Sequence, residues 1–379
     1  MAMCDSVYLD NAATSYPKPA SVITAMQNAL QIGYGNPSRG NHRFSLSSAE
    51  AMFQIRESVA ELIGLGDSRR IIFTQNATMA LNMAIFGLIR EPCHILISDL
   101  EHNSVVRPVE ELRKRIGAVY DTFKTEGDIE HNIRQAIRPD TRYIVSTLAS
   151  NVSGRIVPLS VLSKIRREYG VCVIGDASQV IGHLPIDLSR FPIDVLCAPG
   201  HKGLFGYMGC GFVAIGSEVE LVPHLYGGSG SHSLSLTMPQ EYPDRLEAGT
   251  LPFYAILSMG YGIEHIRQEG LSKLAEKVEM LTRTLCDDLA DIKDLELISE
   301  GRLGIVSLHY KKRTPDQMSE YLNQNGILTR SGLHCAPLAH RTYHTEKDGL
   351  VRISLSSENT QEHIARVRDV IWNMIKAIK

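Results

Sequence analysis

The segment Asp194-Val-Leu-Cys-Ala-Pro-Gly-His-Lys-Gly-Leu-Phe-Gly206 decides the fold of this chain. It begins as a short apolar run, which predicts a buried strand, breaks at glycine, and then presents His201 and Lys202. An earlier apolar run, Val171-Cys-Val-Ile-Gly175, ends in Asp176-Ala-Ser-Gln179. Two successive buried strands that both end in polar side chains predict a parallel α/β sheet with a ligand site at the carboxyl ends of its strands.

The polar residues at these strand ends suit the cofactor pyridoxal 5'-phosphate (PLP). A lysine such as Lys202 can form a Schiff base with the cofactor aldehyde. A carboxylate such as Asp176 keeps the pyridine nitrogen protonated, so that the ring accepts electrons. Taken singly, Lys202 also fits a solvated loop lysine and Asp176 a helix cap. Their occurrence together, at two neighbouring strand ends, favours a PLP site.

Short apolar runs alternate with helical patterns between residues 50 and 260. The stretch 161–169 has apolar residues at helical spacing and is typical of an amphipathic helix. This alternation predicts a mainly parallel sheet with helices on both faces. The runs that predict buried strands are 71–74, 94–98, 142–148, 171–174, 194–198 and 211–215.

The composition changes near residue 256, and we expect a smaller C-terminal α/β domain beyond it. One long helical stretch, 256–291, is the expected connector. A chain of 379 residues is long enough for two or three domains. We therefore predict a large domain of residues 16–260 and a small domain made of 1–15 and 261–379. Its expected elements are strands at 303–309 and near 327 and 351, and helices at 315–325 and from 360 onward.

The bulk properties exclude several classes of protein. A net charge of −3 without a Lys/Arg block argues against nucleic acid or an anionic membrane as partner. No apolar run approaches the length of about 20 residues that spans a bilayer, and the first residues lack a secretory signal pattern. We therefore expect a cytoplasmic protein. Seven scattered cysteines argue against a disulfide framework and against a thiolate zinc site.

Two further stretches supply candidates for cofactor binding. The sequence from Ile71 to Asn82 reads as a strand, a polar turn and the start of a helix. Backbone N–H groups at a helix N-terminus, with the Thr78 hydroxyl, would hold a phosphate group, although an ordinary helix cap fits as well. His102 follows another predicted strand. It suits either stacking on a flat ring or a structural role.

A third stretch, Thr329-Arg-Ser-Gly-Leu-His-Cys-Ala-Pro337, places Cys335 in a loop. Nearby positive charge favours the reactive thiolate, and Arg330 and Arg352 are candidates to supply it. Arg352 also suits bidentate binding of a substrate carboxylate. The alternatives are a buried, inert cysteine and surface arginines.

Together these motifs resemble the class V, fold-type I PLP enzymes of the cysteine desulfurase and selenocysteine lyase family. Within that family they are similar to the subgroup with a short catalytic-cysteine loop. The resemblance implies the fold-type I architecture, an α/β fold whose large domain has a mainly parallel, seven-stranded sheet between helices. The resemblance covers nearly the whole chain, from Tyr8 to Thr360. It rests on Leu9-Asp-Asn-Ala-Ala-Thr14, Asn36-Pro-Ser-Arg-Gly-Asn-His42, Asp176-Ala-Ser-Gln179, Gly200-His-Lys202 and Arg330-Ser-Gly-Leu-His-Cys-Ala-Pro337.

The resemblance implies roles for the residues around the cofactor ring. Lys202 is the Schiff-base lysine and, once released, moves the Cα proton. Asp176 pairs with the pyridine nitrogen and Gln179 with the ring hydroxyl. His102 stacks on the ring as a catalytic residue, and Cys335 is the nucleophile that accepts sulfur.

The resemblance also implies how the phosphate is bound. Ala77, Thr78 and His201 hold it, and Thr250 reaches it from the second subunit of a homodimer. Pro199 stands where members of the family often carry a phosphate-binding serine. Proline has neither a hydroxyl nor an N–H group, so that contact is lost or replaced here.

The remaining implied roles concern the substrate. Asn151 and Arg352 bind its carboxylate, and His42 and Arg330 line the entrance. The loop 338–349 that follows the cysteine is richer in histidine and charge than the family pattern leads us to expect.

The implied reaction converts L-cysteine to L-alanine and leaves the sulfur on Cys335 as a persulfide, for delivery to a sulfur-acceptor protein. Selenocysteine lyase activity uses the same residues. Other class V reactions, namely transamination, epimerisation and sulfinate desulfination, stay open, as does a cofactor-binding delivery protein with little turnover. A zinc enzyme built on Cys197, His201 and Cys210 would leave Lys202 unexplained.

Overall fold

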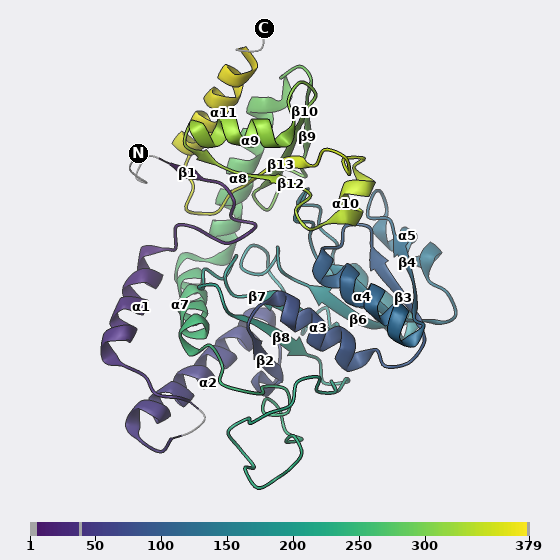
Figure 1. Cartoon of the computed structure of the whole chain (residues 1–379), viewed down its shortest axis with the longest axis vertical. Helices are drawn as coiled ribbons and strands as arrows, with labels where there is room; N and C mark the ends of the chain where they lie inside the picture. Colours follow the sequence, from purple (N-terminus) through teal and green to yellow (C-terminus); the bar gives the residue numbers. More distant parts are fainter. Residues whose placement is uncertain (1–5, 38–39, 377–379) are drawn as a thin grey trace.

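The structure is a computed structural model that describes residues 6–37 and 40–376. It consists of a large α/β body and a smaller one that lies above it in Figure 1. Among the described residues, no helix is both long and apolar enough to cross a membrane.

The large body is built on a seven-stranded sheet with the order β2-β8-β7-β6-β5-β3-β4. Strand β8 runs antiparallel to both of its neighbours, and the other pairs are parallel. The fold class predicted from the sequence is thus confirmed. The strands are β2 (Ile71–Thr74), β3 (His94–Ser98), β4 (Val119–Phe123), β5 (Thr141–Thr147), β6 (Cys172–Asp176), β7 (Val195–Pro199) and β8 (Gly211–Ile215).

Helices cover both faces of this sheet, because successive strand residues point to opposite sides and both sides are apolar. Phe73 packs into a core with residues of α1, α2, α6 and α7, whereas its neighbour Ile72 packs with residues of α3 and α4. The helices are α1 (Ala20–Ile32), α2 (Arg43–Ile63), α3 (Ala77–Leu88), α4 (Asn103–Ile116), α5 (Ile129–Ala136), α6 (Leu159–Tyr169) and α7 (Phe253–Glu269), with a short 3-10 helix, η2, at Ser68–Arg70.

The smaller body contains a four-stranded antiparallel sheet with the order β12-β13-β10-β9. The N-terminal strand β1 (Val7–Tyr8) pairs with β11 of this body. The first described residues therefore join a body that is otherwise built from the C-terminal part of the sequence. The other elements are α8 (Leu271–Ala290), β9 (Leu295–Ile298), β10 (Ile305–Tyr310), α9 (Pro315–Gln324), β11 (Ile327–Leu328), β12 (Arg330–Gly332), α10 (Pro337–Thr342), β13 (Leu350–Ser354) and α11 (Gln361–Lys376).

Two local predictions were wrong. The stretch 256–291 is not one helix, because Gly270, at a φ of 87°, ends α7 and α8 starts directly after it. Helix α7 contacts α1 and α2 of the large body, whereas α8 contacts α11 of the smaller one. The segment 338–349 is not wholly a loop either, since α10 begins at Pro337, and proline is favoured in the first turn of a helix. The domain boundaries stay a prediction, and residues 1–5 and 377–379 of the predicted small domain lie outside the described residues.

Candidate active site

The candidate site lies at the carboxyl ends of β6 and β7. Asp176 is the last residue of β6 and is 3% exposed, and Lys202 follows the end of β7 in a short turn. The two strands are parallel neighbours, so both residues reach the same edge of the sheet. A cavity opens there, and eight of the predicted site residues line it: Ala77, Thr78, His102, Asn151, Asp176, Gln179, His201 and Lys202.

The turn that carries Lys202 packs backbone to backbone against the turn that follows β6. A Cβ atom on Gly182 would lie 2.2 Å from the carbonyl oxygen of Gly203, and one on Gly203 would lie 2.1 Å from the carbonyl oxygen of Ile181. Such distances exclude any side chain. Glycine at both positions therefore sets where Lys202 stands relative to Asp176.

The environment of Lys202 favours its neutral form. Burial lowers the pKa of its ammonium group to about 8, an effect that Asp176 opposes and that Arg352 and Arg330 reinforce. An amine with this pKa is partly deprotonated near neutral pH, and the neutral amine is both the nucleophile and the base. Asp176 in turn accepts a hydrogen bond of 2.9 Å from the backbone N–H of Ser178.

His102 is held as a neutral ring. It is the N-cap residue of α4, and its Nδ1 accepts a hydrogen bond of 3.1 Å from the backbone N–H of Ser104. An accepting Nδ1 leaves the ring proton on Nε2. Burial lowers the pKa of His102 to about 4, so the ring is uncharged at neutral pH.

A buried acid, Glu101, was missed by the sequence reasoning. Its Oε1 accepts a hydrogen bond of 2.7 Å from the backbone N–H of Thr147 at the end of β5, while its Oε2 is buried without a partner. Burial raises the pKa of Glu101 to about 8. Only its place beside His102, at a strand end, hinted at a role. Its burial could not be read from the sequence.

The opposite end of the cavity suits a phosphate group. Helix α3 begins at Ala77, and the Asn76 side chain caps it by accepting a 2.9 Å hydrogen bond from the backbone N–H of Met79. The first N–H groups of a helix have no partner within it and attract anions. His201 also lines the cavity, and its Nδ1 is buried without a hydrogen-bond partner. This unpartnered nitrogen, the helix N-terminus and the Lys202–Asp176 pair together fit PLP.

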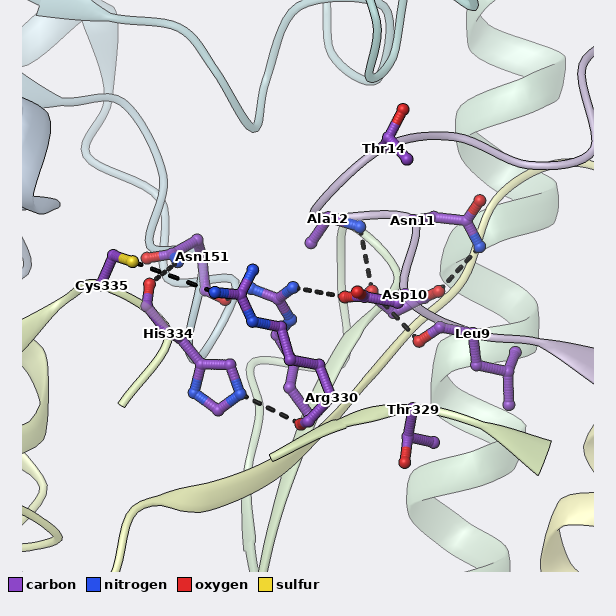
Figure 2. A network of polar contacts seen from close by, with 12 residues as sticks. Leu9, Asp10, Asn11, Ala12, Thr14, Asn151, Thr329, Arg330, His334 and Cys335 are labelled. Atoms are coloured by element: carbon purple, nitrogen blue, oxygen red, sulfur yellow. Dashed lines mark hydrogen bonds and ion pairs between the residues drawn. The ribbon is translucent and has the colours of Figure 1, made fainter. Parts of the chain in front are cut away.

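Arg352 lies between the two bodies, where it contacts Asp10 and Asn151. Figure 2 labels both of these partners within a network of polar contacts. Arg352 is 1% exposed. Its Nη2 lies 2.7 Å from Asp10 Oδ1 and its Nη1 lies 3.1 Å from the carbonyl oxygen of Asn151. Its Nε is buried without a partner, so this guanidinium retains a free donor. Asn151 also lines the cavity, which links the network to the site.

Cys335 stands on an exposed loop between β12 and α10. His334 and Cys335 both take left-handed backbone conformations, with φ values of 50° and 55°. The Sγ atom lies 3.9 Å from Nη2 of Arg330, a contact drawn in Figure 2. The backbone carbonyl of Cys335 accepts a 2.7 Å hydrogen bond from the N–H of Asn103, which follows His102. The cysteine loop is therefore tied to the helix that carries His102.

Arg330, Arg352 and Cys335 do not line this cavity, and two further predicted site residues, Thr250 and His42, also lie outside it. Thr250 is exposed, and His42 is the exposed N-cap residue of α2. Pro37, from the motif that ends at His42, and Gly249, which precedes Thr250, line a different cavity between α2 and the segment after β8. Ser38 and Arg39, which belong to the motif that ends at His42, lie outside the described residues. Within residues 6–37 and 40–376, no three His, Cys, Asp or Glu side chains are grouped to hold a metal ion.

Comparison with known proteins agrees with this geometry. The family model described as aminotransferase class-V matches residues 7–367. The chain belongs to the class V aminotransferase family. Enzymes of this family are in general PLP-dependent. The resemblance found in the sequence is thus confirmed at the level of the family.

Curated relatives and solved structures of class V proteins point to one branch. The chain is 30% identical to a probable cysteine desulfurase of Methanothermobacter thermautotrophicus over 372 residues, which are 95% of this chain and 92% of that protein. It is also 30% identical to the cysteine desulfurase of Salmonella typhimurium over 373 residues, 95% of this chain and 91% of the relative.

The fold is shared with solved members of the class V family. The apo structure of a cysteine desulfurase from Thermococcus onnurineus superposes with a TM-score of 0.92 at 26% identity, covering 99% of this chain and 96% of that one. A cysteine desulfurase structure from Escherichia coli, at 23% identity, gives a TM-score of 0.90, with 99% and 96% of the two chains covered. At 23% identity, the similarity to the Escherichia coli structure supports the fold alone.

Proposed function

We propose that this class V enzyme is a cysteine desulfurase, which converts L-cysteine to L-alanine and takes the sulfur onto Cys335. The observation that carries the proposal is an exposed thiol on a loop tied to the His102 helix, with an arginine 3.9 Å from its sulfur. A transaminase, an epimerase or a sulfinate desulfinase has no need of such a thiol. The names of the curated relatives support the same choice.

We propose PLP as the cofactor, which supplies an electron sink for charge that develops at the substrate Cα. Lys202 would hold its aldehyde carbon and Asp176 its pyridine nitrogen. Gln179 would face the ring hydroxyl, and the neutral ring of His102 would stack on the cofactor. The phosphate would bind the start of α3 at Ala77 and Thr78, together with the free Nδ1 of His201, with Thr250 supplied by a second subunit.

Lys202 also moves the proton in this proposal. With a pKa of about 8, its amine is a base of suitable strength near neutral pH. After substrate binding releases it, Nζ takes the proton from the substrate Cα. Asp176 lines the same cavity and opposes the lowering of the Lys202 pKa.

Arg352 and Asn151 bind the substrate carboxylate. Arg352 is held in place by Asp10 and by the Asn151 carbonyl, and its unpartnered Nε is a free donor for the incoming carboxylate. A guanidinium that is already oriented loses little entropy on binding. Arg330 and His42 would line the entrance.

The sulfur step belongs to Cys335. Its thiolate attacks the substrate sulfur, so that a sulfur–sulfur bond forms as the carbon–sulfur bond breaks. The electron pair of the broken bond stays with the three-carbon fragment, which takes up a proton and leaves as alanine. No external oxidant or reductant is needed, because the carbon gains the two electrons that sulfur loses when the sulfur–sulfur bond forms. A sulfur-acceptor protein would then take this sulfur in the cytoplasm.

Activity assays on matched variants test the proposal. We expect purified wild type to absorb as a PLP enzyme and to release alanine from L-cysteine. Lys202→Ala should lose the absorbance. Cys335→Ala should keep the absorbance but lose at least about a hundredfold in alanine formation. Cys93→Ala, at a half-buried cysteine away from the site, is the control and should behave as wild type.

Two results would contradict the function. In one, the protein carries PLP but is inert on cysteine. In the other, Cys335→Ala releases alanine from cysteine as fast as wild type. Parallel assays with selenocysteine and with a sulfinate would then identify the reaction.

A further inference from the structure

Behind the Cys335 loop lies a chain of buried polar side chains that the proposed reaction does not use. His334 and His340 are 3% and 0% exposed, and Thr345 is 7% exposed. The two imidazoles stack at 5.7 Å between centroids, with 12° between their planes. His340 belongs to the histidine-rich stretch 338–349 that sequence analysis singled out, and His334 directly precedes Cys335. Ala336, Ala339 and Leu350, from the same part of the sequence, belong to one small buried apolar cluster.

Three hydrogen bonds link these side chains to the cysteine loop. The Thr345 Oγ1 lies 2.7 Å from His340 Nδ1. His340 Nε2 lies 3.5 Å from His334 Nδ1. His334 Nε2 lies 3.2 Å from the carbonyl oxygen of Arg330. The chain thus ends on the backbone of the arginine whose guanidinium faces the Cys335 sulfur.

The last acceptor fixes the direction of every donor. A carbonyl oxygen only accepts, so His334 must carry its proton on Nε2, and in a neutral ring its Nδ1 then accepts. His340 must therefore donate through Nε2, which leaves its Nδ1 to accept from the Thr345 hydroxyl. Burial lowers the pKa of both histidines, so both rings are neutral.

Removing the Thr345 hydroxyl disturbs the whole series of hydrogen bonds from His340 to the Arg330 carbonyl. Without that donor, the Nδ1 of His340 lacks its partner, and only the hydrogen bond to His334 still holds the ring proton on Nε2. If the proton moves to Nδ1 of His340, two accepting nitrogens face each other, or His334 changes tautomer and loses the Arg330 carbonyl. Either result releases the left-handed turn at His334 and Cys335, which non-glycine residues adopt only when their surroundings impose it.

We propose that Thr345, His340 and His334 form a neutral, one-directional hydrogen-bond chain that holds Cys335 in position for sulfur transfer, with His340 as a positioning residue. The inference rests on the proposed desulfurase function. It concerns a different property of the site, namely how the nucleophile is held in position. Of the three residues in the hydrogen-bond chain, only His334 adjoins Cys335 in the sequence.

Matched substitutions at Thr345 test the chain in the PLP-loaded protein. Thr345→Val keeps the shape and removes the hydroxyl, whereas Thr345→Ser keeps the hydroxyl. For Thr345→Val we expect kcat for alanine formation to fall about tenfold or more, with KM and the cofactor absorbance unchanged, because displacing a nucleophile by about 1 Å is costly. Alkylation of Cys335 by iodoacetamide, followed by the mass of its peptide, should slow at least about threefold as the thiol leaves Arg330. Thr345→Ser should match wild type in both assays.

Equal behaviour of the Val and Ser variants in both assays would overturn the inference. A general loss of structure would instead lower cofactor absorbance and raise KM, which also counts against it. If Thr345→Val does not fold, His340→Gln and His340→Phe replace the pair. Gln retains a donor and an acceptor and should rescue the function that Phe loses. If wild type makes no alanine, the proposed function fails, and the alkylation rates still decide whether the chain positions Cys335.

Discussion

At the scale of single residues, Arg352 is a buried cation with one carboxylate partner. Its Nη2 lies 2.7 Å from Asp10, whose side chain is 22% exposed. We expect Asp10→Asn to lower the free energy of unfolding by about 2–4 kcal/mol, because it leaves a buried charge without its counterion. Urea unfolding measures this change. Asp67→Asn is the control: it breaks an exposed pair with Arg69 and should cost less than about 1 kcal/mol. Equal losses in both variants would contradict the account.

Glu101 makes the stability of the protein depend on pH. Burial raises its pKa from 4.5 to about 8, so between these values the folded state binds a proton that the unfolded state has released. The contribution of Glu101 to the free energy of unfolding should therefore fall as pH rises through this window. Glu101→Gln cannot titrate, so its stability relative to wild type should improve by up to a few kcal/mol between pH 5 and pH 8. Urea unfolding at both pH values measures the difference in free energy of unfolding between the two proteins. If this difference is the same at pH 5 and pH 8, the pKa of Glu101 is not raised.

The chemistry of the reactive residues was predictable from the sequence because it depends on local order. Lys202 and Asp176 each follow an apolar run, and such residues must meet at one edge of a parallel sheet. The Asp10–Arg352 pair was not predictable, because its partners are joined only when β1 pairs with β11. The unpaired Nδ1 of His201 was hidden for the same reason: it depends on side chains brought together from several elements.

At the scale of elements, the turns after β6 and β7 decide where Lys202 stands. Gly182 has a φ of 74°, and a Cβ there would lie 2.2 Å from the Gly203 carbonyl. We expect Gly182→Ala to displace this turn and to abolish cofactor binding, as followed by absorbance and by retention of PLP after gel filtration. Gly117→Ala is the matched control: its φ is 71° but no atom lies within 4 Å of the added Cβ. It should keep the cofactor and lose only about 1 kcal/mol of stability. A PLP-replete Gly182→Ala protein would show that the turn is adaptable.

Periodicity predicted the buried elements well and the exposed ones poorly. All six predicted strands of the large sheet are present, because each is an apolar run buried on both faces. Strand β4 was missed, since most of Val119–Phe123 is exposed at the sheet edge and carries no apolar run. The break between α7 and α8 was missed because one glycine, Gly270, interrupts a pattern that is otherwise helical on both sides.

At the scale of the whole molecule, one chain leaves the proposed phosphate site incomplete. Thr250 and His42 are exposed, away from the cavity that the other site residues line. Large apolar side chains are also exposed on the neighbouring helices α1 and α2, among them Ile32 at 66% and Phe53 at 58%. Light scattering should therefore give about twice the chain mass of 42.0 kDa.

The same proposal predicts a defect in Thr250→Val. Loss of one hydroxyl contact to a phosphate should weaken PLP binding by about tenfold to a hundredfold, since a hydrogen bond to a charged group contributes about 1.5–3 kcal/mol. The variant should remain dimeric. Titration of the apoprotein with PLP measures the affinity, and Thr250→Ser is the control. A monomeric wild type that binds PLP with full affinity would refute the shared site.

The most direct test of the central claim is a single turnover that locates the sulfur. PLP-loaded protein is mixed with less than one equivalent of L-cysteine and then digested. The masses of its cysteine-containing peptides are measured by mass spectrometry, and the alanine formed is quantified. We predict one extra sulfur atom on the peptide that contains Cys335, in the same amount as the alanine formed. Alanine formed without added sulfur on Cys335, or with sulfur on another cysteine, would contradict the account.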